Sequence, residues 1–256
     1  MFLSLTPSVH RTTGMRPGQP PRTSSLAALA LVAGLGVGLA GPAQAGRPLA
    51  TDDAETAPAG SCQVEGWAEK AGADRGWVLA PACGVAPGLE INGSLTRFTA
   101  SALSAEGELG AKWSPHAAHL HTPLGELRLG ARLSLGSERQ PAGGWVRTRT
   151  SALGLASLVI SDAWSVHANL GMQRDEVSLD RAALGRLALV WSPNEWWQVA
   201  LETQRSRSRT IFGNPEHGIA LRRWLMKDHL ALDVTASHPV GDGVHWSAGF
   251  GWYSGE

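Results

Sequence analysis

The chain has 256 residues, of which 43% are hydrophobic and only 17% charged, with 31 glycines and 15 prolines. This composition favours a β-rich fold with many turns over a helical one. The 22 basic and 22 acidic residues cancel, so the overall charge disfavours nucleic acid or an anionic lipid surface as a partner.

The N-terminus has the pattern of a secretory signal peptide. Arg16 and Arg22 precede an apolar run from Ser25 to Ala40, and Ala43-Gln44-Ala45 supplies a small-x-small cleavage site. Met15 offers an alternative start that would give a signal of ordinary length. The apolar run is interrupted by glycines and is shorter than the ~20 residues that a spanning helix needs. We therefore expect residues 1–45 to direct export and to be removed.

Both cysteines fall in the exported part. The stretch from Cys62 to Cys83 is typical of a hairpin, in which residues 62–70 and 76–83 are strands around a Gly/Asp turn at residues 71–75. This fold places Cys62 opposite Cys83, and an oxidising compartment favours a disulfide between them. Two cysteines without a nearby histidine pair do not supply the four ligands of a structural zinc site.

Apolar and polar residues alternate along the rest of the chain. Alternation is clean in five segments, residues 127–135, 164–173, 197–202, 230–237 and 244–253, and predicts strands with one apolar and one polar face. With the weaker runs the pattern gives about twelve strands, most near the ~9–11 residues that cross a bilayer as tilted strands. The expected strands are residues 62–70, 76–83, 88–98, 105–114, 124–135, 144–156, 163–173, 181–191, 196–205, 217–226, 229–237 and 243–253.

The connections between these strands alternate in character. Those at residues 84–87, 157–162, 192–195 and 227–228 are short, whereas those at 140–143, 175–180, 206–216 and 238–242 are more polar. Residues 114–123 are an exception, because they are long on the short side. Short turns on one side and long loops on the other are typical of outer-membrane barrels. The predicted fold is all-β, an antiparallel up-and-down transmembrane β-barrel of about twelve strands. The expected organisation is a signal peptide (1–45), a periplasmic N-terminal segment (46–61) and a β-barrel domain (62–256).

The tryptophans support this interpretation. Indole prefers the headgroup zone of a membrane, where its ring is in apolar surroundings and its N–H is hydrated. Neighbouring residues of a strand point to opposite faces, so we expect Trp197 to face lipid and Trp196 the periplasmic mouth. A soluble sandwich that buries these rings is the alternative. Seven tryptophans lie at expected strand ends on the short-turn side, and two lie near the other rim: Trp113, Trp164, Trp191, Trp196, Trp197, Trp224 and Trp252, then Trp77 and Trp145.

Four stretches resemble a family of proteobacterial outer-membrane β-barrels, the transporter-like proteins related to the meta-pathway phenol-degradation barrels. They are "RPLATDDAETAPAGSCQVEGW" (47–67), "VHANLGM" (166–172), "WSPNEWWQVALE" (191–202) and "GIALRRWL" (218–225). The resemblance covers most of the exported chain, and residues 88–156 match less clearly. It implies a barrel in the outer membrane of a Gram-negative bacterium, with outer-membrane lipid as a partner and a small molecule as a candidate permeant.

The polar faces carry both signs of charge, so they predict neither a strongly anion-selective nor a strongly cation-selective pore. The lumen groups either pair and fill a narrow bore or line a water-filled pathway. The wider polar set also includes Glu90, Asn92, Glu108, Lys112, Arg147, Arg149 and Gln204. The residues expected to face the lumen are Arg128, Arg132, His167, Asn169, Gln198, Glu202, Arg222, Asp233 and His245.

Catalytic and cofactor motifs are not recognisable. The sequence has no Gly-x-Ser-x-Gly elbow, His-Glu-x-x-His pair or phosphate-cradling glycine loop. His116, His119 and His121 cluster, but without an evident carboxylate partner we interpret the cluster as incidental. We therefore expect no catalytic residue, metal or cofactor.

Three hypotheses follow. The preferred one is an outer-membrane barrel that acts as a passive channel or envelope component for small molecules. The second is a soluble periplasmic barrel that binds a small apolar ligand. The third is an outer-membrane enzyme.

Overall fold

A computed structural model describes residues 49–71, 74–99, 105–140, 143–208, 215–240 and 243–254. The expected signal peptide lies outside them. None of the helical residues in these ranges forms a segment long and apolar enough to cross a membrane. The described elements are β1 (Cys62–Ala71), β2 (Asp74–Ala86), β3 (Leu89–Phe98), β4 (Ala105–Trp113), the 3-10 turn η2 (His116–Ala118), β5 (His119–Thr122), β6 (Gly125–Arg139), β7 (Trp145–Ser161), β8 (Trp164–Asp175), β9 (Arg181–Asn194), β10 (Trp197–Ser208), β11 (Glu216–Met226), β12 (Leu230–Pro239) and β13 (His245–Tyr253).

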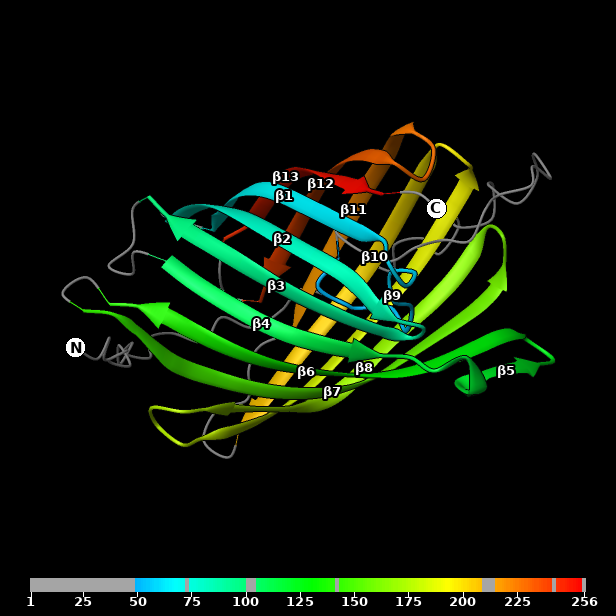
Figure 1. Cartoon of the computed structure of the whole chain (residues 1–256). Helices are drawn as coiled ribbons and strands as arrows, with labels where there is room; N and C mark the ends of the chain where they lie inside the picture. Colours follow the sequence, from blue (N-terminus) through cyan, green and yellow to red (C-terminus); the bar gives the residue numbers. More distant parts are fainter. Residues whose placement is uncertain are drawn as a thin grey trace, which may run out of the picture. The chain divides into compact units, whose positions relative to one another are not determined.

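The strands form a closed antiparallel barrel (Figure 1). Each long strand pairs with its neighbours in the chain, β13 pairs with β1, and β4 pairs with β6. The short strand β5 pairs only with the first residues of β6, so the closed wall within the described residues has twelve strands. The predicted antiparallel barrel of about twelve strands is confirmed.

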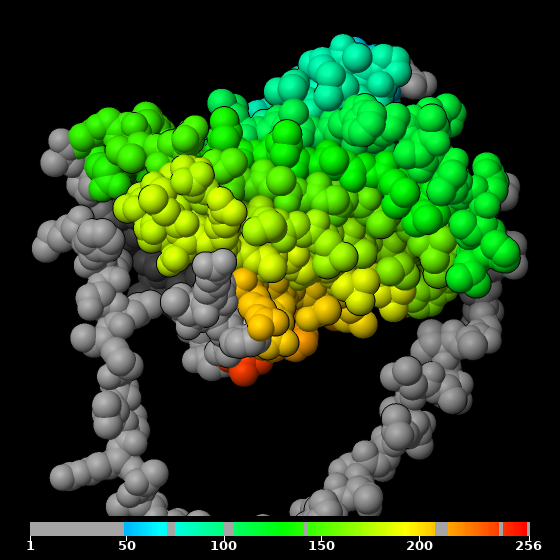
Figure 2. Space-filling model, turned by 90° about the horizontal axis from the view of Figure 1, so that it is seen from below, coloured from blue at the N-terminus to red at the C-terminus, as the bar shows by residue number. Residues whose placement is uncertain are grey.

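Alternation along each strand separates two surfaces. In β8, Ser165, His167 and Asn169 are buried, whereas Leu170 is 72% and Met172 53% exposed. Similar apolar rows lie on the outside of other strands, as at Leu109, Leu133, Leu187, Leu201 and Leu232. Figure 2 shows one outer face, where the green to yellow-green side chains of β4 to β8 form a broad surface. The barrel is therefore apolar outside and polar inside, the reverse of a soluble barrel.

Several boundaries differ from the expected ones. The turn expected at residues 192–195 is shorter, because Ser192 still donates a backbone hydrogen bond to Ala163 (2.8 Å) and β9 continues to Asn194. β6 and β7 are also longer than expected, at 15 and 17 residues, because their backbone ladder continues past the apolar rows to Arg139 opposite Trp145. The long connection at residues 114–123 folds as η2 and β5, which extends the edge of β6.

The cysteines close the first hairpin. β1 and β2 pair with Cys62 directly opposite Cys83, their Cα atoms are 4.1 Å apart, and the two residues form the predicted disulfide. The bridge lies at the end of β1 that follows residues 49–61. It therefore fixes the start of the barrel wall beside the point where the N-terminal segment joins it.

We expect non-reducing gels of the exported chain to show faster migration than reducing gels, and we expect Cys62→Ser to lose this difference. Closing a loop of this length restricts the unfolded chain and stabilises the fold by about 3 kcal/mol. The denaturant midpoint of Cys62→Ser should therefore fall, with Ser61→Ala as a neighbouring control that keeps the bridge. Equal mobility under both conditions would show that the bridge does not form.

Candidate functional site in the barrel lumen

The inner faces of the strands carry most of the buried polar residues. They alternate with the outward apolar rows and come from strands around the whole wall. The buried polar and charged wall residues are Glu65, Glu90, Lys112, Ser134, Ser157, Ser165, His167, Asn169, Ser192, Gln198, Arg222 and Asp233. Buried polar groups need hydrogen-bond partners, and the partners here identify what fills the lumen.

The segment from Leu49 to Ala57 lies inside the barrel, where its blue trace is enclosed by the strands in Figure 1. Its backbone forms hydrogen bonds with side chains of the wall and not with another strand. Asp52 donates its N–H to Asn169 Oδ1 (2.8 Å), and Asn169 Nδ2 donates back to the carbonyl of Asp52 (2.7 Å). Ala54 donates its N–H to Ser157 Oγ (2.8 Å). Residues 49–57 of the expected N-terminal segment (46–61) therefore lie inside the barrel.

Further bonds hold the segment along its length. Ala57 donates its N–H to Glu90 Oε2 (2.9 Å), and the N–H of Thr51 donates to the carboxylate of Glu202. Ser114 donates its hydroxyl to the carbonyl of Ala54, and Arg186 donates to the carbonyl of Ala50 (2.7 Å). Leu49 packs against the buried cluster of Val190, Ala200 and Ala220. The segment thus spans the lumen from the β3 wall to the wall formed by β9, β10 and β11.

The acidic side chains of the segment meet basic residues of β4 and β6. Lys112 Nζ lies 2.8 Å from an oxygen of Asp52 and 2.7 Å from an oxygen of Asp53. Arg132 donates to the other oxygen of Asp52 (2.9 Å). The side chains of Lys112 and Asp53 are each 6% exposed. A charge buried this far needs an opposite charge or several hydrogen bonds, so this group of ion pairs fixes the segment.

Arg128 and Glu55 form a second ion pair between β6 and the segment. Arg128 also donates Nε to Glu126 Oε1 on its own strand (2.9 Å). Glu126 lies 3.4 Å from His119 Nδ1, and His119 contacts the ring of His116, with 3.3 Å between their Nδ1 atoms. The histidine cluster of the sequence thus lies at the short-turn rim, outside the lumen group around Lys112.

A separate ion-pair cluster lies on the opposite wall. Arg222, 1% exposed, lies 3.6 Å from Glu65 and 3.7 Å from Asp233. Tyr253 donates its hydroxyl to Glu65 (2.9 Å), and Arg222 lies 5.8 Å from the centre of the Tyr253 ring. All members of this cluster belong to strands. It is therefore part of the wall itself.

His167 lies between two serines of the inner face. Its Nδ1 is 2.8 Å from Ser157 Oγ and its Nε2 is 3.0 Å from Ser165 Oγ. Ser157 also accepts the N–H of Ala54. This serine–histidine group is covered by the segment and connects it to β7 and β8.

A cavity of about 700 Å³ remains beside the segment. Its lining includes Asp52 and Asp53 of the segment and Lys112 and Arg132 of the wall. Asn92 and Ser94 of β3 and Tyr253 of β13 also line it. The lumen therefore combines a bound peptide segment with open polar space.

The other expected lumen residues lie apart from the Lys112 group. Gln198 is buried in β10 (7% exposed). His245 Nδ1 lies 3.9 Å from Glu216, which also accepts from Gln204 (2.6 Å) and Ser237 (2.5 Å). These contacts belong to the long-loop half of the barrel.

Sequence reasoning missed the lumen role of Asp52, Asp53 and Glu55, and it omitted Arg186. The available signal was the acidic stretch "TDDAE" (51–55), directly downstream of the expected cleavage site in a chain whose inner rows carry several arginines. Alternation could not reveal it, because this stretch forms no strand.

An acidic side chain in the connection between β8 and β9 is held by a hydrogen bond to β7. Glu176, in the connection between β8 and β9, accepts a hydrogen bond from Thr150 Oγ1 (2.6 Å). This bond lowers the pKa of Glu176, with Arg174 and Arg147 nearby acting in the same direction. The connection is thus anchored to β7 by a carboxylate in its charged form.

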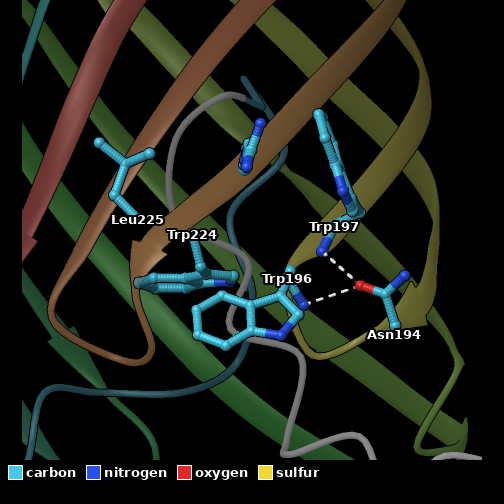
Figure 3. A pocket seen from close by; sticks show the side chains of 6 residues that line it. Asn194, Trp196, Trp197, Trp224 and Leu225 are labelled. Carbon is cyan, nitrogen blue, oxygen red and sulfur yellow. Dashed lines mark hydrogen bonds between the residues drawn. The ribbon is translucent and has the colours of Figure 1, made fainter.

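A smaller cavity of about 430 Å³ lies at the short-turn rim and is lined by tryptophans (Figure 3). Asn194 Oδ1 accepts the backbone N–H groups of Trp196 (2.9 Å) and Trp197 (3.1 Å). The Arg223 guanidinium lies 5.1 Å from the centre of the Trp197 ring, in cation–π range. Trp196 lies in the turn near Trp224, as the figure shows, so the two adjacent tryptophans have different surroundings.

Three solved structures share this architecture. The KdgM porin aligns with a TM-score of 0.58 at 10% identity over 76% of this chain and 99% of its own. The NanC porin gives 0.56 at 8% identity over 75% and 98%. The COG4313 outer membrane channel from Pseudomonas putida F1 gives 0.56 at 10% identity over 79% and 98%. At these identities the likeness concerns the fold alone, which is that of outer-membrane porins.

Sequence comparison places the chain in a family. No protein of curated function matches it. The family model described as "Uncharacterised conserved protein UCP029691" matches residues 33–247, which include residues 49–61 and nearly the whole barrel. The chain therefore belongs to the UCP029691 family.

Proposed function

We propose that the protein is an outer-membrane channel for small molecules, with the barrel lumen as its pathway and the outward rows in lipid. The observation that carries this proposal is the polar lumen, with its cavity of about 700 Å³, inside a wall whose outer rows are apolar. Passive channels of the outer membrane combine these two features. The segment from Leu49 to Ala57 occupies part of the pathway and so restricts it.

The comparisons support a small-molecule permeant. One structural neighbour is a KdgM porin, and the structure of that protein contains disordered oligogalacturonate. The four stretches quoted from the sequence support a relation to the meta-pathway phenol-degradation barrels. We propose export through a cleaved signal peptide at residues 1–45 and location in the outer membrane of a Gram-negative bacterium.

The competing functions fit the geometry less well. A soluble barrel for an apolar ligand needs an apolar interior, whereas the apolar rows here face outward. An enzyme could use Ser157 and His167, but the backbone of Ala54 covers Ser157. Catalysis needs space for a reacting group beside the nucleophile, and the cavity lining does not include Ser157. We therefore assign this group to holding the segment.

Planar bilayer recordings test the channel. We expect the purified exported chain to give discrete current steps, and removal of residues 46–57 to raise the single-channel conductance at least about twofold, because a wider bore conducts more. Heat-modifiable gel mobility would show that the shortened barrel is folded. Absence of current steps from both folded forms would overturn the channel proposal.

Arginine substitution tests the outward rows. Val234 is 50% exposed on β12, whereas Thr235 is directed inward and hydrogen-bonds Ser247 (2.6 Å between hydroxyls). Val234→Arg should destabilise the folded barrel by ~2–4 kcal/mol if it lies at the bilayer midplane. Thr235→Arg should be tolerated better, because its neighbours are polar. Unfolding titrations in lipid vesicles measure the loss of stability in each variant. An equal loss in the two variants would indicate that both faces of the sheet are buried in protein.

Fluorescence quenching tests the rim. Two variants are needed, one with Trp196 and one with Trp197 as its single tryptophan. A brominated lipid should quench Trp197 strongly, because Trp197 begins the outward row that continues with Val199 and Leu201. An aqueous quencher should reach Trp196 better, since that ring lies in the turn. A folded, reconstituted sample without lipid quenching at Trp197 would contradict the proposed orientation.

A further inference from the structure

The ion pairs between wall and segment form a carboxylate-binding site that the chain fills with its own side chains. Lys112 Nζ holds one oxygen of Asp52 and one of Asp53, at 2.8 and 2.7 Å. Arg132 completes the site with a hydrogen bond of 2.9 Å to the second oxygen of Asp52. Charge-assisted bonds of this length are among the stronger polar contacts in proteins. The site thus takes two neighbouring carboxylates.

Lys112 makes its ion pairs with the segment, and the wall adds Glu90, which lies directly opposite it on β3. Among the ion pairs of the described residues, both that Lys112 makes are with the segment, whereas Arg132 also pairs with Glu108 of β4 (2.9 Å). A buried ammonium without a partner is costly. If the segment leaves, Lys112 keeps Glu90 on the wall but loses both of these ion pairs, and the loss favours another anion in the same place.

The site is also open to a solute. Lys112 and Arg132 line the cavity of about 700 Å³, together with Asn92 and Ser94, whose side chains add hydrogen-bonding groups. A small acidic molecule in the cavity would meet the same cations that hold Asp52 and Asp53. It need not pass under the segment.

The segment that carries Asp52 and Asp53 is anchored to the wall only a few residues further along the chain. Gly60 donates its N–H to the carbonyl of Gly84 (2.8 Å), which anchors the chain just before β1. A ligand tethered by so short a linker has an effective concentration of about millimolar or more. A segment held at this effective concentration competes strongly with any free solute for the same cations.

We propose that Lys112 and Arg132 form a binding site for small carboxylate-bearing solutes, chiefly dicarboxylates, and that Asp52 and Asp53 act as a built-in competitor for it. This assignment rests on the proposed channel, whose permeant class it names. A carboxylate solute takes the place of the segment's carboxylates, and a neutral solute of similar size does not.

Titration calorimetry on the exported chain in detergent tests the site with succinate as the probe and sorbitol as the neutral comparison. The Asp52→Asn/Asp53→Asn variant should bind succinate at least about tenfold more tightly than the parent, because the competitor is weakened while the cations remain. Lys112→Met should lose succinate binding, although it too breaks the ion pairs. Arg223→Met, which removes a cation from the outer face, should bind like the parent.

Three results would overturn the site: equal succinate affinity in the parent and the asparagine variant, undiminished binding by Lys112→Met, or equal binding of sorbitol. If the asparagine variant does not fold, the chain lacking residues 46–57 replaces it with the same expectation. Conductance is measured separately, so a barrel that conducts without binding succinate refutes only the site. A barrel that binds succinate without conducting refutes the channel.

Discussion

Backbone polar groups at membrane depth must find partners within the protein, because hydrocarbon offers none. The barrel meets this constraint by closing its ladder. β13 pairs with β1 from Gln63 opposite Tyr253 to Ala71 opposite His245, and β4 pairs with β6 past the short strand β5. Closure directs one row of every strand inward. The interior must then accommodate bulky polar and charged side chains, many of which are buried.

The N-terminal segment resolves part of this problem. Its backbone N–H groups satisfy Asn169, Ser157 and Glu90, and its carboxylates neutralise Lys112 and Arg132. Segment and wall are thus complementary, and the inner rows are satisfied without a wholly apolar core.

The sequence predicted the wall well because a strand is a local pattern. Alternation with period two identified the strands, and the hairpin symmetry about residues 71–75 paired Cys62 with Cys83. The predicted strand boundaries were wrong where backbone pairing continued beyond the apolar row, as at Ser192. The lumen contents were not predictable in this way. The contacts of Asp52 with Lys112 and Arg132 join residues 60 and 80 positions apart, and no periodicity connects a non-strand segment to the rows that it meets.

The two charged clusters of the lumen also differ in whether they include the N-terminal segment. Arg222, Glu65 and Asp233 are all fixed to strands, so their ion pairs persist as long as the barrel is closed. Lys112 makes its ion pairs with a segment that is not part of the ladder. The inward rows of the strands carry both acidic and basic side chains, and these charges alone suggest a bore without ion selectivity. Near Lys112 the wall itself supplies Glu90, directly opposite on β3, and Glu108, which pairs with Arg132, while the segment adds Asp52 and Asp53 as the ion-pair partners of Lys112. If a solute displaces the segment, as the proposed site requires, Lys112 loses both of these ion pairs and the bore shifts toward a preference for anions, a change that the wall sequence alone does not reveal.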